Sequence, residues 1–315
     1  MIMRRLIFAI LACFCMAAPA AAQTRSVAVT FDDLPWQGPS VDLCDPAAAM
    51  ALTRDFVGML EPLDAHATAF INEEKVCDAQ RATLLPRILS VWLDAGVELG
   101  NHTYSHPSIL NMSAEAWLQD VDRGEIITRP LLAKRGKTLR YFRHPYLFTG
   151  ETPEKKAAMA EGLKDRGYIV APVTIDNSDW IYAALYRKAE KDGDQAAMQS
   201  IGEAYVDYMQ GVFAHYEPYS AEVAGGREPA QILLLHANSL NRDWYPKIHA
   251  MLLARGYRFI PLEEALKDPI YARPENWLRR NGVSWLHRWN DAAGRKVRWE
   301  PDPPEWVMKA YEALN

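Results

Sequence analysis

The sequence predicts an α/β fold in which seven parallel strands, with helices between them, close into a barrel. Two observations predict it. Short runs rich in β-branched and aromatic residues alternate with longer helical patterns, which is typical of repeated strand–helix units. Several helical stretches also end at a glycine, such as Gly96, Gly167 and Gly256, and the next strand follows at once.

The predicted strands share a short, largely apolar run; they are residues 26–31, 66–72, 97–101, 138–143, 168–175, 231–236 and 257–261. The helical stretches between them share a longer pattern; they include residues 46–63, 79–95, 113–133, 153–166 and 243–255. This strand and helix order is that of repeated βα units around a parallel sheet.

The first residues predict a cleavable secretory signal. Arg4 and Arg5 precede an apolar run, residues 6–16, and the sequence Ala-Pro-Ala-Ala-Ala ends at Ala22. The run is shorter than the roughly 20 residues that a membrane-spanning helix needs. We therefore expect cleavage after Ala22, no membrane span in the mature chain, and export to the periplasm or beyond.

Two segments interrupt the strand–helix alternation. Residues 181–226 form a polar, tyrosine-rich and largely helical insertion between the fifth and sixth strands. Residues 268–315 form a C-terminal extension with five tryptophans: Trp277, Trp285, Trp289, Trp299 and Trp306. Because large aromatics at irregular spacing more often bury area than form a ligand-binding platform, we expect the extension to pack on the barrel. The predicted parts are a signal peptide (1–22), a barrel domain (23–267) and the extension.

Charge and cysteine content restrict the function further. Removing the signal takes away two arginines and no acidic residue, so the formal net charge moves from −5 to −7. A mildly acidic exported protein is a poor ligand for nucleic acid or anionic membranes. The mature chain keeps Cys44 and Cys77, and two thiols left in an oxidising compartment usually pair, so we expect a disulfide between them.

Five of the seven predicted strands end in a cluster of ionisable or metal-binding residues. The clusters are Asp32-Asp33, His102 to His106, Arg143 to Tyr146, Asp176 to Trp180, and His236. Each alone has a bland explanation, such as a solvated turn, a surface charge or a hydrogen-bonded core histidine. In a parallel βα barrel, however, chemistry lies at the C-terminal ends of the strands, so the five together predict one site.

A metal fits two of these clusters. His102 and His106 are four residues apart, which puts both imidazoles on one side of a helical turn, a common arrangement around first-row metals. Two imidazoles and one aspartate carboxylate leave coordination positions open for water and substrate, as catalytic metals require.

In order along the chain, the five clusters resemble the five motifs of the polysaccharide deacetylase family, the NodB-homology group of carbohydrate esterases. The resemblance covers about residues 26–262 and implies a distorted (β/α)7 barrel. It implies that Asp33, His102 and His106 bind one divalent metal, typically Zn²⁺, with Co²⁺, Ni²⁺ or Mn²⁺ tolerated in some members.

The resemblance also implies roles for the remaining site residues. Asp32 is the expected catalytic base and Arg143 holds it; His236 is the expected catalytic acid and Asp179 orients it; the backbone N–H of Tyr146 faces the oxyanion. Pro145, Tyr146, Trp180 and Leu235 are expected to contact substrate, with Trp180 and Leu235 around the acetyl methyl group. Where the third motif usually reads Arg-Pro-Pro-Tyr-Gly, this chain has His144 and Leu147, which we expect to reshape the substrate groove.

These roles agree with elementary chemistry. A bound divalent metal lowers the pKa of water from about 15.7 toward ~7, so a carboxylate can complete its deprotonation. An amine leaves poorly unless it is protonated, so a separate acid is needed. With these roles, the resemblance implies a hydrolase that removes acetyl groups from an N-acetylated glycan, and we expect it to be a monomer. An O-acetyl esterase or small-substrate amidase, and a non-catalytic glycan-binding barrel, are the alternatives.

Overall fold

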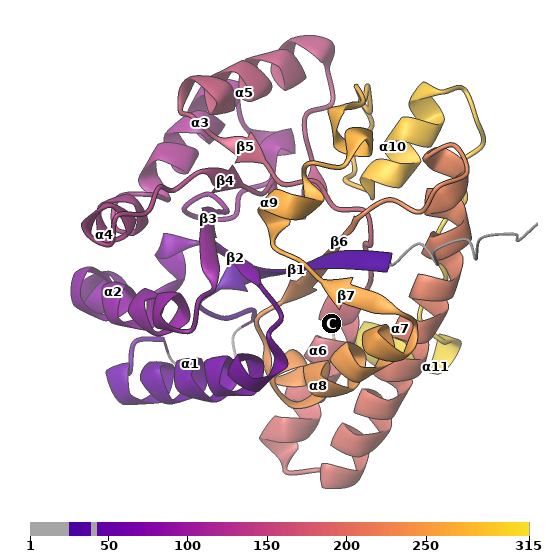
Figure 1. Ribbon diagram of the computed structural model, residues 1–315. Coiled ribbons are helices and arrows are strands. Elements are labelled where there is room, and N and C mark those ends of the chain that lie inside the picture. The colour runs from indigo at the N-terminus through magenta and orange to yellow at the C-terminus, as the bar shows by residue number, and fades with distance from the viewer. Residues whose placement is uncertain (1–24, 39–42, 315) are drawn as a thin grey trace, which may run out of the picture.

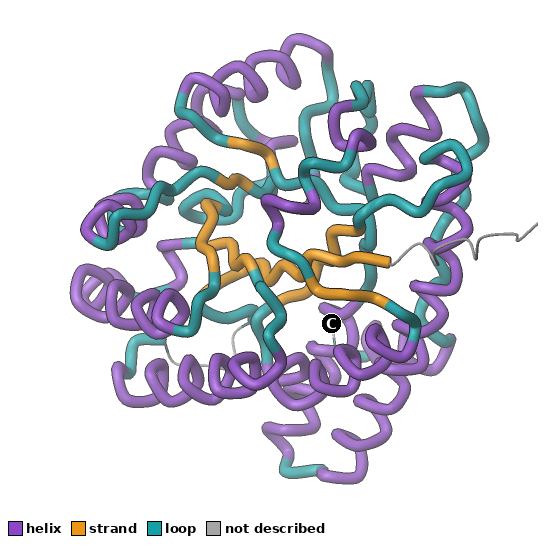
Figure 2. The backbone as a smooth tube through the Cα atoms, in the orientation of Figure 1, coloured by secondary structure: helices purple, strands orange, loops and turns teal. Residues whose placement is uncertain are grey.

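The computed structural model describes residues 25–38 and 43–314, and the predicted signal peptide lies outside these residues. Strands gather at the centre of the molecule and helices surround them (Figures 1 and 2). In the described part of the chain, no helix is both long and apolar enough to span a membrane.

All strand pairings in the sheet are parallel, as expected. The strands are β1 (Arg25–Leu34), β2 (Thr68–Ile71), β3 (Glu98–Asn101), β4 (Tyr141–Phe142), β5 (Ile169–Val170), β6 (Gln231–His236) and β7 (Tyr257–Phe259). Their order is β5-β4-β3-β2-β1-β6, and β7 pairs with the beginning of β1. The predicted βα barrel is therefore confirmed, and the position of β7 beside β1 distorts it.

The fifth strand is shorter than predicted because the chain changes partner. Ile169 and Val170 pair with β4, but the N–H groups of Thr174 and Ile175 donate to the carbonyl of Ile232 in β6. A parallel bridge joins Ile175 to Leu233. Residues 171–175 thus cross from one edge of the sheet to the other, which curls it into a barrel and brings the fourth and fifth motifs together.

Helices cover the outside of the sheet (Figure 1). The longer ones are α1 (Pro46–Leu60), α2 (Asp78–Asp94), α3 (Ala114–Arg123), α5 (Pro153–Asp165), α6 (Asp179–Asp192), α7 (Gln195–Val223) and α8 (Ser239–Ala254). The shorter ones are α4 (Thr128–Lys134), α9 (Leu262–Ala265), α10 (Trp285–Ala292) and α11 (Glu305–Glu312). Side chains of Asp45, Ser113, Thr152 and Asn238 cap helices α1, α3, α5 and α8.

The predicted helix 113–133 is broken into α3 and α4. The buried carboxylate of Glu73 accepts hydrogen bonds from the N–H groups of Ile127 and Thr128, so it caps a new helix there. A Cβ on Gly124 would approach Thr103 and Tyr104 to 2.6 and 2.7 Å. The break therefore lets the end of α3 pack directly against the histidine-bearing loop.

Cys44 and Cys77 form the expected disulfide, with their Cα atoms 5.1 Å apart. It joins the segment before α1 to the segment before α2. Because Cys77 follows Lys75 by two residues, the bridge tethers a loop that reaches the functional site described below.

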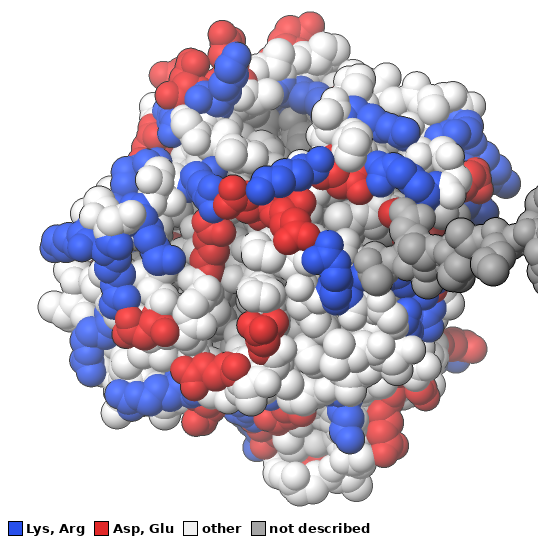
Figure 3. All heavy atoms as spheres, in the orientation of Figure 1, with Lys and Arg blue, Asp and Glu red and all other residues white. Residues whose placement is uncertain are grey.

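In the extension, α10 contacts α7 and α11 contacts α6, two helices that lie almost wholly in the insertion. Trp277, Trp285 and Trp289 are buried, whereas Trp299 and Trp306 are about half exposed. On the face in Figure 3, acidic and basic side chains are interspersed and no broad basic surface forms.

Candidate active site

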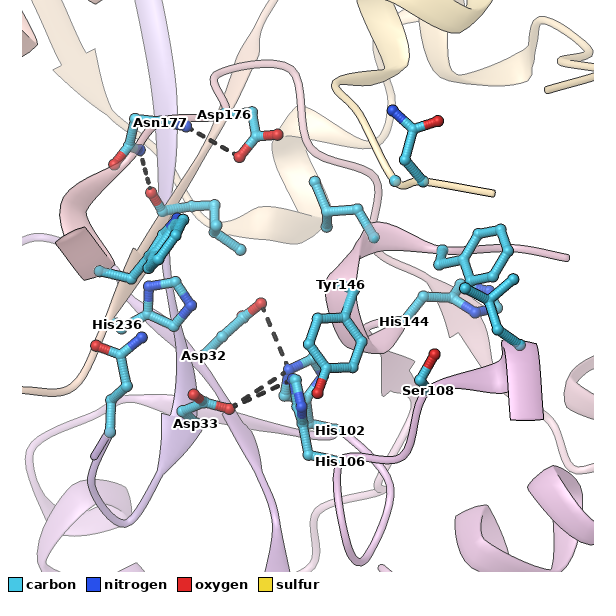
Figure 4. Close-up of a pocket in the computed structure, with 18 of the residues that line it drawn as sticks. Asp32, Asp33, His102, His106, Ser108, His144, Tyr146, Asp176, Asn177 and His236 are labelled. Carbon is cyan, nitrogen blue, oxygen red and sulfur yellow. Dashed lines mark hydrogen bonds and ion pairs between the residues drawn. The ribbon is translucent and has the colours of Figure 1, made fainter. Parts of the chain in front are cut away.

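Asp33, His102 and His106 converge where β1 and β3 end. The Nε2 atoms of His102 and His106 lie 3.8 and 3.6 Å from the same oxygen, Oδ1 of Asp33. One ligand atom from each of the three residues lies within 4.8 Å of the others. Figure 4 shows both imidazoles directed at the carboxylate from one side. The structure thus brings the three predicted metal ligands together.

Local backbone geometry directs these side chains inward. Asp33, Thr103 and His106 have positive φ values of 71°, 68° and 53°, so the chain turns sharply after each strand. The side-chain oxygen of Asn101 accepts the Thr103 N–H at 2.7 Å, and the amide nitrogen of Asn72 donates to the His102 carbonyl at 2.6 Å. These bonds fix the loop that carries both histidines.

The donors of this cluster fit a divalent metal. Oδ1 of Asp33 is buried and accepts no hydrogen bond. Nδ1 of His102 lies 2.8 Å from the carbonyl oxygen of Arg143, so an Nδ1–H donated there leaves the Nε2 lone pair free toward Asp33. Burial, the largest influence, lowers the pKa of both His102 and His106, so the imidazoles are neutral, as metal ligands must be.

Asp32 lies beside this cluster and is held by Arg143. The guanidinium Nη1 donates to both carboxylate oxygens at 3.3 and 3.2 Å, and both side chains are buried. Burial raises the pKa of Asp32 to about 6 although the charge of Arg143 lowers it. The charge of Arg143 favours the carboxylate form of Asp32, but burial outweighs that influence.

His236 faces Asp32 from the neighbouring strand, since the two are register partners in the β1–β6 pair. Its Nδ1 lies 2.7 Å from Oδ1 of Asp179, and its backbone N–H donates to Oδ2 at 2.9 Å. Burial, the largest influence, lowers the pKa of His236, but the charge and hydrogen bond of Asp179 more than offset it and raise that pKa to about 9. His236 is therefore a protonated donor at neutral pH.

One cavity of about 690 Å³ lies beside the side chains described so far. Its lining comes from every motif and includes Asp32, Asp33, His102, His106, His144, Tyr146, Leu147, Asp176, Trp180, Leu234 and His236. Tyr146 is 59% exposed, and its ring contacts that of His106 at 4.5 Å (Figure 4). Trp180 is 42% exposed and packs edge-on against Tyr311. A cavity of this size suits a small ligand or part of a glycan.

Two of the expected substrate contacts are wrong. Leu235 is fully buried in the core and does not line the cavity, whereas Leu234 does. Side chains alternate between the two faces of a strand, so the residue on the face of His236 is two positions before it, not one. Pro145 is also buried and is not among the residues that line the cavity, whereas its neighbours His144 and Tyr146 are.

Sequence reasoning missed Lys75. Its Nζ lies 3.4 Å from Oδ2 of Asp33 and donates to the carbonyls of Asp33 and Trp36 at 3.2 and 3.3 Å. Burial raises the pKa of Asp33, but Lys75 and the neighbouring histidines outweigh it and hold that pKa well below its usual range. The loop after the second strand carries this lysine, so position at a strand end was the available signal.

Asn241 and three residues of the extension were missed as well. The side-chain amide of Asn241 donates to Oδ2 of Asp179 and to the His236 carbonyl, each at 2.9 Å. Arg280, Asn281 and Gly282 of the extension line the cavity. No sequence pattern marks these three residues as part of the site.

Comparison with known sequences agrees with the motif analysis. Residues 20–164 match the model of the polysaccharide deacetylase family. A peptidoglycan-N-acetylglucosamine deacetylase from Bacillus cereus is 26% identical over 154 residues, which are 49% of this chain and 46% of that protein. The match therefore spans about half the length of the curated relative.

One solved structure shares the fold, and another aligns less closely. The chitin deacetylase from the fungal pathogen Colletotrichum lindemuthianum aligns over 83% of this chain and 94% of its own, with a TM-score of 0.51 and 21% identity. A peptidoglycan deacetylase from Bacillus subtilis aligns over 78% of this chain and 92% of its own, with a TM-score of 0.46 and 23% identity. The alignment with the chitin deacetylase covers most of both chains, so the common fold extends beyond residues 20–164, which the family model matches.

Proposed function

Because the chain belongs to the polysaccharide deacetylase family, we propose that it is a metal-dependent hydrolase that removes acetyl groups from N-acetylated amino sugars of a polysaccharide or oligosaccharide. The observation that carries the proposal is the convergence of three metal-type ligands with a held carboxylate and a carboxylate-bound histidine around one cavity. A protein that only binds glycans has no need of a held carboxylate and a carboxylate-bound histidine beside metal-type ligands.

The residues that would hold a divalent cation are Asp33, His102 and His106. Two nitrogen donors and one oxygen donor most simply suit Zn²⁺, which would supply Lewis-acid polarisation of the acyl carbonyl and make water a stronger acid. Lys75 holds the second oxygen of Asp33, which leaves Oδ1 directed at the histidines.

Asp32 accepts the proton of the attacking water. Arg143 bonds both oxygens of Asp32 from the side, and donates through Nε and Nη2 to the Ala171 carbonyl and Thr30 hydroxyl at 2.9 and 3.0 Å. Such a fully bonded guanidinium keeps the carboxylate in one orientation. The base therefore has little rotational freedom to lose when substrate binds.

His236 donates a proton to the departing amine nitrogen. Asp179 occupies Nδ1, so the proton available to substrate is on Nε2. The backbone N–H of Tyr146 stabilises the oxyanion, and Trp180 with Leu234 border the acetyl group. Asp32 and His236 thus act from opposite sides of the scissile bond.

The other features of the proposal follow from the same residues. Disulfide formation between Cys44 and Cys77 supports export into an oxidising compartment. On the sequence grounds given above, we propose a barrel domain 23–267 with its insertion and an extension 268–315. We also propose that the protein is a monomer.

The test is acetate release from defined N-acetylated oligosaccharides by enzyme treated with a chelator. We expect no release without metal and recovery when Zn²⁺, Co²⁺, Ni²⁺ or Mn²⁺ is added singly. The panel includes acetyl esters and small acylated amines. Faster turnover of those compounds would replace the proposal with an O-acetyl esterase or amidase, and metal-independent release would reject the metal.

A further inference from the structure

We propose that the C-terminal extension is a working part of this active site, in which Arg288 and Gly282 position the turn at Pro145–Leu147. That turn carries the Tyr146 N–H, so the inference rests on the proposed function. We refer to Pro145–Leu147 as the oxyanion turn. Arg288 and Gly282 are positioning residues and act through its backbone.

The oxyanion turn has an unfavourable backbone conformation. Tyr146 has φ 54° and ψ 19°, and Leu147 follows with φ 52°. Residues other than glycine rarely adopt this left-handed region, and Leu147 stands where the family motif usually has glycine. Two such residues in succession persist only where surrounding structure holds them.

Arg288 supplies part of that support from α10. It is completely buried, and its Nη2 donates to the Leu147 carbonyl, its Nη1 to the Thr149 hydroxyl at 3.0 Å, and its Nε to the Val283 carbonyl at 3.1 Å. Glu275 lies 3.6 Å away and balances its charge. One planar guanidinium thus ties the strained Leu147 to the extension, a geometry that lysine cannot reproduce.

Gly282 brings the extension backbone onto the turn. A Cβ built on Gly282 would overlap the Tyr146 carbonyl oxygen and stand 2.6 Å from the Leu147 carbonyl carbon. The Ser284 hydroxyl donates to the Thr174 carbonyl, and the Trp285 N–H donates to the Val173 carbonyl, each at 2.7 Å. The extension is therefore fixed to the barrel on one side and contacts the oxyanion turn on the other.

This arrangement matters for catalysis because an oxyanion donor must be fixed before the reaction begins. If the turn relaxes, the Tyr146 N–H moves away from the developing charge while most substrate contacts remain. The expected signature is a loss in kcat with little change in KM. If Arg288 and Gly282 only stabilised the fold, their variants would have a lower melting temperature but no selective loss in kcat.

The test compares full-length variants saturated with Zn²⁺. Gly282→Ala and Arg288→Met should each lower kcat about 10- to 100-fold, below the cost of removing an oxyanion donor outright, with KM within roughly threefold. Arg288→Lys should fall between Arg288→Met and the native enzyme. Metal content by elemental analysis should stay at the native value, because the three ligands lie on other loops.

Matched controls lie elsewhere in the chain. Gly58→Ala makes the same change where a Cβ meets nothing within 4 Å, and Arg279→Met removes an exposed arginine of the extension that pairs with Asp291. Both should retain native kcat. Native kcat in Gly282→Ala and Arg288→Met, or equal losses in the controls, would overturn the inference.

A rescue experiment covers the case in which Arg288→Met folds poorly. Leu147→Gly removes the Cβ that disfavours the positive φ, so the double variant should turn over faster than Arg288→Met alone. The inference would be contradicted if the loss in kcat of the double variant equalled the product of the losses of Leu147→Gly and Arg288→Met. Failure of the native enzyme to release acetate would instead reject the proposed function.

Discussion

The two sides of the cavity differ in how completely the protein satisfies its own polar groups. On the acid side, Asp179 receives hydrogen bonds on both oxygens: Oδ1 is bonded to His236 Nδ1, and Oδ2 accepts from the His236 N–H and from Asn241. Asp179 is fully buried, and these three donors match its charge.

On the metal side, the carboxylate is only half satisfied. Oδ2 of Asp33 pairs with Lys75, but the buried Oδ1 accepts no hydrogen bond and faces His102 and His106. A buried, unpaired carboxylate oxygen between two neutral imidazoles is costly unless a cation joins them. The acid side therefore satisfies its own polar groups, whereas the other side keeps a buried oxygen that fits the proposed cation.

The largest effect should come from breaking the metal side. His102→Ala should lose bound metal and lower acetate release by at least about 10⁴-fold, because Lewis-acid stabilisation of several kcal/mol is lost. Metal content by elemental analysis and turnover check this together. His66→Asn, at an exposed site with φ 46° that asparagine tolerates, is the matched control and should retain both. Stoichiometric metal in His102→Ala would contradict the assignment.

Removing the base should separate chemistry from metal binding. Asp32→Asn keeps the shape of the side chain but cannot take a proton, so turnover should fall about 10³-fold. Metal content should remain near native, since the three ligands are intact. Asp64→Asn, an exposed left-handed residue, is the control with native turnover. Unchanged acetate release in Asp32→Asn would reject the mechanism.

Weakening the acid side should change the pH profile. His236 acts only when protonated, so with its pKa raised to about 9 its activity is kept below that pH and lost as pH rises through it. Asp179→Asn removes the largest raising influence and leaves only Asp32 and Asp33 to favour the charge. The alkaline limb of kcat should move to lower pH, with kcat about 10²-fold lower at its optimum.

The control for that experiment is Asp192→Asn, at the other end of α6, where the carboxylate is half exposed and pairs with Lys188. Its pH profile should match the native one. An alkaline limb that stays in place in Asp179→Asn would mean that another group supplies the proton.

The smallest effect should follow from trimming Asn241. Asn241→Ala removes one of the three donors to Asp179, so the carboxylate keeps its two bonds from His236. We expect a loss of about 1 kcal/mol in the free energy of unfolding and a few-fold lower kcat. Denaturant titration and initial rates measure both, and a loss as large as that of Asp179→Asn would contradict this ranking.

Much of this site could be predicted from the sequence because its residues follow strands. The C-terminal ends of parallel strands meet at one rim of a barrel, so Asp33 near the end of β1 and His102 just after β3 were expected to lie close together. The Cys44–Cys77 pair followed from compartment and count alone. The error at Leu235 shows the limit, since one residue decides which face of a strand a side chain occupies.

By itself, the sequence determined the βα order, the strand ends and the residue types that converge there, because hydrophobic periodicity and short motifs depend only on residues that are close in sequence. Only the tertiary structure decided that β7 pairs with β1, that Lys75 reaches Asp33, and that Arg288 holds the Leu147 turn across 141 positions of sequence. Such contacts depend on how distant segments pack, and neither hydrophobic pattern nor spacing encodes which surfaces meet.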